Sequence, residues 1–238
     1  MNTKTLFKLA TLLFLVVALG TVAVAQTTYY VNVVTGLDGY NGLSATVTGT
    51  PGVGPKATIS NAIAAASPGD IISVDYGNGN PYNETPTVTF KLTFTSTNGT
   101  PNVLSWVIFN ANASPNNWVA FTGPFKITAG LTLQAGAVTG AGNLNVGTSV
   151  TRYVGSTVDA QLLYTGTVNF IYRGGAAITT GLELPPASNT GTTGGIQTLD
   201  AGTVLTLSEN KTMNGLLNLI LGMNLGGNTL TLNGAVTT

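Results

Sequence analysis

The sequence predicts an all-β protein, a right-handed parallel β-helix (β-solenoid) with a short N-terminal capping α-helix. The first observation is a phrase repeated through the second half of the chain: an apolar, a polar and an apolar residue, often followed by glycine or asparagine. The clearest copies are Leu131-Thr132-Leu133, Leu144-Asn145-Val146, Leu205-Thr206-Leu207, Leu217-Asn218-Leu219, Met223-Asn224-Leu225 and Leu230-Thr231-Leu232. The outer side chains of such a triplet lie on one face of a strand, and one short strand cannot bury that face unless copies of it stack.

The second observation is a longer repeat, which sets the size of one coil. Leu133-Gln134-Ala135-Gly136-Ala137-Val138 recurs as Leu199-Asp200-Ala201-Gly202-Thr203-Val204. Three coils between the copies give about 22 residues per coil, a normal solenoid period, and roughly seven or eight turns in all. Glycine and asparagine favour this fold over a sandwich, because they adopt the left-handed backbone angles of a corner without a hairpin reversal.

Residues 1–25 are expected to be a secretory signal peptide. Two lysines, Lys4 and Lys8, precede an apolar run over residues 9–19, and the small residues Ala23-Val24-Ala25 form a cleavage site before Gln26. This order is typical of a secretory signal, and the apolar run is too short for a good membrane span. We therefore expect a secreted or cell-surface protein that is not inserted in the membrane after signal removal.

The next segment, residues 26–84, is expected to contain a strand, a loop, the capping helix and the first coil. Aromatic and β-branched residues over 29–34 predict the strand, and glycine-rich sequence follows it. Residues 57–66 predict the helix, because alanine dominates them, Ile59 and Ile63 share one face, and a Pro-Gly pair ends the pattern. A short helix of this kind can cover the open end of a narrow solenoid.

This N-terminal order carries a resemblance to a known family. Its motifs are Tyr30-Val31, Lys56-Ala57-Thr58-Ile59, Ala62-Ile63, Ala65-Ala66, Pro68-Gly69-Asp70, Ile72-Ser73-Val74 and Tyr82-Asn83-Glu84. Over residues 30–84 they resemble the cap and first coil of secreted right-handed parallel β-helix proteins of the pectate-lyase-like superfamily. The long loop and the extra glycines between Val74 and Tyr82 depart from that pattern. The resemblance implies a fold and a secreted lifestyle, but the superfamily holds lyases, hydrolases, adhesins and inert stalks, so it selects no function.

The coils are expected to occupy residues 85–238. Apolar residues alternate at period two from Thr87 onward, and the segment 87–118 is interpreted either as wide early coils or as a small hairpin packed on the side. Residues 228–238 resemble the opening of another repeat, with no polar helix or charged strand to cover the stack. We therefore expect a β-helix truncated at its C-terminus, the N-terminal part of a longer surface protein.

Composition excludes several function classes. Only 7% of residues are charged, against about 25% in typical proteins, and the chain without its signal peptide has six bases and eight acids, a net charge of −2 (6 − 8). No basic patch exists for nucleic acid or an anionic membrane. Histidine and cysteine are absent, which excludes disulfides, thiol or imidazole chemistry and zinc sites built from these ligands. No cofactor and no metal are expected.

The remaining candidates for chemistry are carboxylates, which are scattered singly along the chain. A glycosidase needs two of them roughly 5 to 10 Å apart. The separation of Asp159 from Glu183 is close to one predicted coil, so both would fall on adjacent coils near Arg173, and these three are the weak catalytic candidates. The alternative for such acids is a solvated corner position.

Tyrosines provide the candidates for ligand binding. Tyr164 and Tyr172 flank an alternating run, and together with Arg173 they are expected to form an exposed patch on which sugars stack. A place in the core is the alternative for both rings. The pair of glycines in Gly194-Gly195-Ile196 is expected to be only a turn, because the regularly spaced aspartates of a calcium-binding repeat do not accompany it.

The leading hypothesis from the sequence is a non-catalytic, structural or adhesin-like β-helix module that is secreted or held at the cell surface. The alternative is a β-helix that binds or degrades extracellular polysaccharide, as a lyase or glycosidase. Expected partners are extracellular polysaccharide or cell-surface components, with no nucleic acid. End-to-end self-association through an open terminal coil is a third hypothesis.

Overall fold

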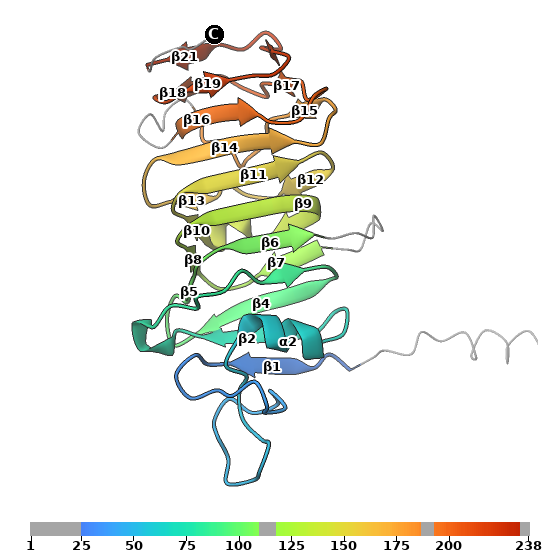
Figure 1. The fold of residues 1–238 in the computed structure, drawn as a ribbon, viewed down its shortest axis with the longest axis vertical. Helices are drawn as coiled ribbons and strands as arrows, with labels where there is room; N and C mark the ends of the chain where they lie inside the picture. Colours follow the sequence, from blue (N-terminus) through green and yellow to red (C-terminus); the bar gives the residue numbers. More distant parts are fainter. Residues whose placement is uncertain (1–24, 110–117, 187–192, 234–238) are drawn as a thin grey trace, which may run out of the picture.

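The computed structural model describes residues 25–109, 118–186 and 193–233, and it confirms the expected parallel β-helix. Short strands stack as a rod of about seven turns, with the chain climbing from the N-terminal loop at one end to β21 at the other (Figure 1). Every strand pair described is parallel. The expected signal peptide falls outside the described residues, apart from Ala25. No helix in the described ranges is long and apolar enough to cross a membrane.

The longest sheet has twelve strands and covers two sides of the rod. Its strands are β1 (Thr28–Val31), β2 (Ile71–Asp75), β3 (Thr87–Val88), β4 (Leu92–Thr97), β6 (Trp106–Phe109), β7 (Trp118–Phe121), β9 (Gly130–Thr139), β11 (Ser149–Tyr153), β12 (Ser156–Val158), β14 (Val168–Arg173), β16 (Thr193–Thr198) and β19 (Leu217–Asn218). The two sides meet in β9, whose first half pairs with β6 and β11 and whose second half pairs with β7 and β12. Gly136, with φ of 78°, allows the bend between the halves.

Three smaller sheets complete the coils. One contains β5 (Asn102–Val103), β8 (Phe125–Ile127), β10 (Leu144–Val146) and β13 (Leu163–Tyr164); the second contains β15 (Ile178–Thr179), β17 (Leu205–Thr206) and β20 (Met223–Asn224); the third contains β18 (Lys211–Met213) and β21 (Leu230–Leu232). Two 3₁₀ turns, η1 (Gly77–Gly79) and η2 (Ala141–Asn143), lie at corners. Each of these sheets therefore adds one short strand per turn.

Stacking in register builds the core. Leu131 pairs with Val150, Val150 with Phe170, Phe170 with Ile196 and Ile196 with Leu217, so one inward column takes one residue from each of five successive coils. The first four are buried and Leu217 is half-buried. The sequence numbers of neighbours in this column differ by 19 (150 − 131) to 26 (196 − 170), which brackets the predicted period.

The longer sequence repeat spans three coils, as expected, but it is offset by one residue. Leu133 pairs with Arg152, Arg152 with Tyr172 and Tyr172 with Thr198, so the structural equivalent of Leu133 is Thr198 and not Leu199. A shift of one residue moves a side chain to the opposite face of a strand. Leu133 is accordingly 1% exposed, whereas Leu199 is 42% exposed.

The capping helix α2 (Ile59–Ala65) lies beside β1 and β2 (Figure 1) and buries Ile59, Ala62 and Ile63. It is shorter than the predicted 57–66, because Thr58 and Ala66 are both extended and flank it as caps. Two acids stabilise its first turn. Glu84 accepts hydrogen bonds from the backbone N–H of Ile59 at 2.7 Å and of Ser60 at 2.9 Å, and Asp38 accepts one from the Thr58 N–H at 3.0 Å.

Residues 87–109 form wide coils and not a side hairpin, since β3, β4 and β6 belong to the long sheet and pair with strands of neighbouring coils. Residues 110–117 of the same predicted segment lie outside the described residues. Phe94 and Trp106 of this segment are buried in the interior, together with Phe121 and Phe125 of the chain that follows. Trp106 lies 4.9 Å from Phe94, 5.1 Å from Phe121 and 5.4 Å from Phe125 between ring centroids, in edge-to-face contacts. Such contacts add about 0.5–1.5 kcal/mol per pair to the effect of burial.

We predict that Leu205→Asp prevents stable folding and that Thr206→Asp is tolerated. Leu205 is buried between Ile178 and Met223 of the adjacent coils, so a carboxylate there has no partner, whereas the Thr206 side chain lies on the other face of β17. The free energy of unfolding should fall by at least about 3 kcal/mol for Leu205→Asp and by less than about 1 kcal/mol for Thr206→Asp. Urea unfolding followed by circular dichroism measures both, and equal losses would contradict the inward and outward assignment.

Candidate functional site

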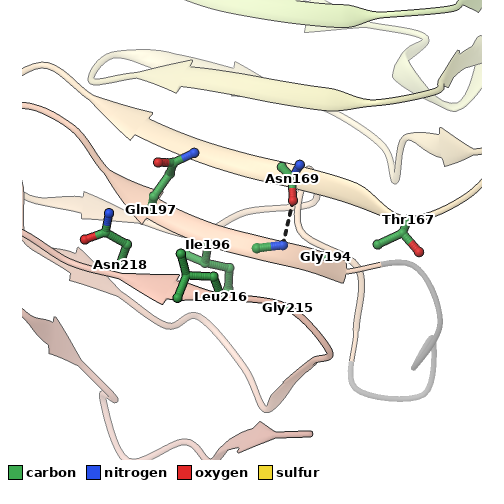
Figure 2. A pocket seen from close by; sticks show the side chains of 9 residues that line it. Thr167, Asn169, Gly194, Ile196, Gln197, Gly215, Leu216 and Asn218 are labelled. Carbon is green, nitrogen blue, oxygen red and sulfur yellow. Dashed lines mark hydrogen bonds between the residues drawn. The ribbon is translucent and has the colours of Figure 1, made fainter. Parts of the chain in front are cut away.

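A groove of about 410 Å³ runs across the outer face of β14, β16 and β19 (Figure 2). This volume is in the range of roughly 300–1,000 Å³ that is usual for ligand sites. The lining residues are Thr167, Asn169, Gly194, Gly195, Ile196, Gln197, Gly215, Leu216 and Asn218. None of them carries a charge, so the groove presents amide, hydroxyl and hydrocarbon groups only.

A β-bulge creates the groove. Val168 pairs with Thr193 and Phe170 with Ile196, so β16 places two residues, both glycines, opposite the single residue Asn169 of β14. The stretch Gly194-Gly195-Ile196, expected to be a turn, therefore lies within a strand. The pair of glycines serves a bulge and not a turn, because a bulge accommodates an extra residue inside a ladder and glycine is favoured where backbones come close.

The glycines of the groove have no room for side chains. A Cβ atom added to Gly194 would lie 2.7 Å from Oδ1 of Asn169, and one added to Gly215 would lie 2.2 Å from the carbonyl oxygen of Gly194. The floor is therefore bare backbone, and its hollow shape follows from the close packing of these coils. Leu216, which is 46% exposed, adds an apolar surface beside it.

Three amides stand around this floor on successive strands (Figure 2). Asn169 is fixed by the protein, because its Oδ1 accepts a hydrogen bond from the Gly195 N–H at 2.8 Å. Gln197 and Asn218 pair in register on β16 and β19. Among the described residues, no hydrogen-bond partner exists for either of these two side chains. Each thus offers two N–H donors and one carbonyl acceptor to a ligand.

The predicted catalytic residues do not come together at one site. Asp159 caps the turn η2, where its carboxylate accepts hydrogen bonds from the N–H groups of Gly140 at 2.8 Å and Ala141 at 3.0 Å. Glu183 is 1% exposed and forms an ion pair with Arg152 at 2.7 Å. The two carboxylates therefore bind different partners in different parts of the fold.

Arg173 has a third set of partners. Its guanidinium forms an ion pair with Asp200 at 3.0 Å and donates a hydrogen bond to the Tyr153 hydroxyl at 3.2 Å. The hydrogen bonds from Arg173 and from the Gly174 N–H hold the pKa of Asp200 below its usual value. This cluster lies at a partly exposed corner, and neither of its charges lines the groove.

The exposed patch predicted for Tyr164, Tyr172 and Arg173 does not form. Alternation along β14 turns Tyr172 inward, where it is 0% exposed and donates a hydrogen bond to Glu183 at 3.2 Å. Tyr164 is half-buried, packs edge-to-face on Phe170 with ring centroids 5.7 Å apart, and donates to the Glu183 carbonyl oxygen. The core alternative is thus correct for Tyr172, and Tyr164 packs against the same core.

Arg152 is a residue that sequence reasoning missed, as are the side chains that line the groove. It stands in the inward column between Leu133 and Tyr172, and its guanidinium contacts Glu183 as well as the carbonyl oxygens of Ser156 and Thr179. The available signal was its spacing, since Arg152 follows the inward Val150 by two positions. These contacts supply the partners that a buried charge requires.

All eight acids of the chain lie in the described ranges, and each accepts a hydrogen bond from the protein. The acids are Asp38, Asp70, Asp75, Glu84, Asp159, Glu183, Asp200 and Glu209. Within the described part of the chain, no three metal-ligating side chains gather. The carboxylates therefore fix turns, caps and ion pairs.

No protein-family model matches the chain, and comparison with curated proteins and with solved structures found no match.

We predict strong coupling between Arg152 and Glu183. Removing one partner leaves the other charge buried, so Glu183→Leu and Arg152→Met should each lower the free energy of unfolding by about 3–5 kcal/mol. The double variant should lose much less than the sum of these values. A double-mutant cycle in urea measures the coupling, and the exposed pair Arg173 and Asp200 is the control in which additivity is expected. Additive losses at the buried pair would contradict the prediction.

We predict that the protein loses stability in alkaline solution. Burial raises the pKa values of Tyr82, Tyr164 and Tyr172 above the usual value near 10. These hydroxyls stay protonated in the folded state while the unfolded chain releases their protons, so the free energy of unfolding falls as pH rises above about 10. The slope is about 1.4 kcal/mol per pH unit for each tyrosine. Urea unfolding at several pH values measures it; an unchanged slope in Tyr172→Phe would exclude that residue.

Proposed function

We propose that this chain is a non-catalytic secreted or cell-surface module, a structural or adhesin-like β-helix whose role is extension and contact. The observation that carries the proposal is that the carboxylates are engaged in hydrogen bonds and ion pairs within the fold. Every carboxylate accepts a hydrogen bond within the fold, and the groove on the long sheet is lined by uncharged residues. General acid–base catalysis requires a titratable group within reach of the substrate, and this groove offers none from its lining residues.

We also propose that the chain is secreted. Secretion is supported by the basic and apolar pattern of residues 1–25 and by the small residues before Gln26. Assignment to the non-catalytic or adhesin-like branch of the pectate-lyase-like superfamily is likewise proposed, on the N-terminal motifs and on the parallel β-helix fold that they implied. The expected partners remain extracellular polysaccharide and cell-surface components.

End-to-end self-association also remains a proposal. The inward residues of the last described strands, such as Leu217, Met223 and Leu230, are only half-buried, because no described coil stacks on them. At the other end of the rod lie β1 and the loop that follows it, with α2 packed beside β1 and β2 (Figure 1). Contact between copies would therefore use the β19 to β21 end.

Degradation of polysaccharide is the alternative function, and a direct assay separates the two. The chain without its signal peptide is incubated with plant and bacterial polysaccharides, with and without calcium, and soluble products are measured. We expect no product. Product that disappears in Asp159→Asn or Glu183→Gln, with circular dichroism showing that the variants are folded, would establish the enzymatic alternative and refute the proposal.

A further inference from the structure

We propose that the groove across β14, β16 and β19 binds an uncharged, hydroxyl-rich polysaccharide chain, and that the side chains of Gln197 and Asn218 make the principal contacts. The inference rests on the proposed contact function and gives it a site and a ligand class. The groove is a separate surface from the buried pair of Arg152 and Glu183.

The hydrogen-bonding capacity of the groove fits hydroxyl groups. A hydroxyl both donates and accepts, and so does a primary amide, which makes Gln197 and Asn218 suitable partners for sugar rings. The side-chain carbonyl oxygen of Asn169 accepts a hydrogen bond from the Gly195 N–H, which fixes the side chain. Its NH₂ group is therefore held in a defined orientation. Because Gln197 and Asn218 have no partner among the described residues, a ligand does not have to displace a protein hydrogen bond to reach them.

The floor fits the apolar face of a sugar ring. Bare glycine backbone at Gly194 and Gly215 permits close approach, and the exposed part of Leu216 offers hydrocarbon next to it. Ligand sites commonly combine an apolar lining with a few polar groups that fix orientation. Here the polar groups stand on adjacent strands about 4.8 Å apart, comparable with the length of one residue in an extended sugar chain. Successive sugar residues of a polymer that lies across the strands would therefore contact successive amide side chains.

Other ligand classes fit less well. The floor of the groove offers no free edge to an extended peptide that adds a strand, because β16 is paired with β14 on one side and with β19 on the other. The free edge at this end of the described sheet is that of β19. Nucleic acid and acidic polysaccharide need basic side chains, and none lines the groove. The absence of charge among the lining residues thus selects a neutral polymer.

The experiment is binding of the chain without its signal peptide to soluble polysaccharides, measured by affinity electrophoresis and by titration calorimetry. The probes are neutral polymers, namely a β-glucan, a mannan and a dextran, and two acidic polymers, polygalacturonate and alginate. We expect binding to at least one neutral polymer and none to the acidic ones. The double variant Gln197→Ala/Asn218→Ala should bind at least about tenfold more weakly.

A matched control removes one glutamine and one asparagine elsewhere. Gln134 on β9 and Asn83 in an exposed loop lie outside the groove, and neither has a hydrogen-bond partner among the described residues. The variant Gln134→Ala/Asn83→Ala should bind like the original protein. Unfolding curves of both double variants should match that of the original, since none of the four side chains has a hydrogen-bond partner among the described residues.

Several outcomes overturn the inference. Binding to no neutral polymer, binding to acidic polymers alone, or equal affinity of the groove variant and the original protein would each refute it. A change of oligomeric state in the groove variant, seen by analytical ultracentrifugation without a change in polymer binding, would make the groove a contact between copies instead. Soluble product in the same mixtures would refute the proposed non-catalytic function. If the protein neither binds a neutral polymer nor releases product, only the assignment of the ligand is refuted.

Discussion

The parallel ladder between successive coils is the constraint on which the other features depend. Because each coil is held in register with the next by backbone hydrogen bonds, a side chain that points inward must fit directly against its equivalents one coil before and one coil after. The column from Leu131 to Leu217 satisfies this requirement, because each coil contributes one aliphatic or aromatic residue to it. A single residue of slip would expose the whole column, so register and burial reinforce one another.

The same constraint explains how the interior changes along the rod. The early coils bury rings, with Trp106 in contact with three phenylalanines. The later coils bury charge: Arg152 meets Glu183, and Lys211 donates to the Leu184 carbonyl oxygen at 2.6 Å and to Glu209 at 2.7 Å. A polar residue in an inward column cannot turn away, so the fold must bring it a partner from another side of the coil.

Local sequence predicted the features that depend on alternation and on caps. The triplets around Thr132 and Thr206 indicated the inward faces correctly, and the alanine-rich segment indicated α2. The failures came from residues whose environment is set by another coil. Tyr172 looks like an exposed aromatic until the register places it beside Glu183, and Leu199 looks like a core residue until one extra position turns it outward. The groove was missed for the same reason, since a bulge at Gly194 exists only relative to the neighbouring strand.

The unequal length of the coils has a consequence for how such a rod can change over time. The step from Phe170 to Ile196 is longer than the step from Leu131 to Val150, yet both return the chain to the same column. One of the additional residues is the bulge within β16, and the other described ones lie in the turns at the corners between strands. Insertions and deletions at these corners can lengthen or shorten the rim of the outer groove while the ladder persists. The molecule therefore separates the part that must be preserved for folding from the part that is available for new recognition.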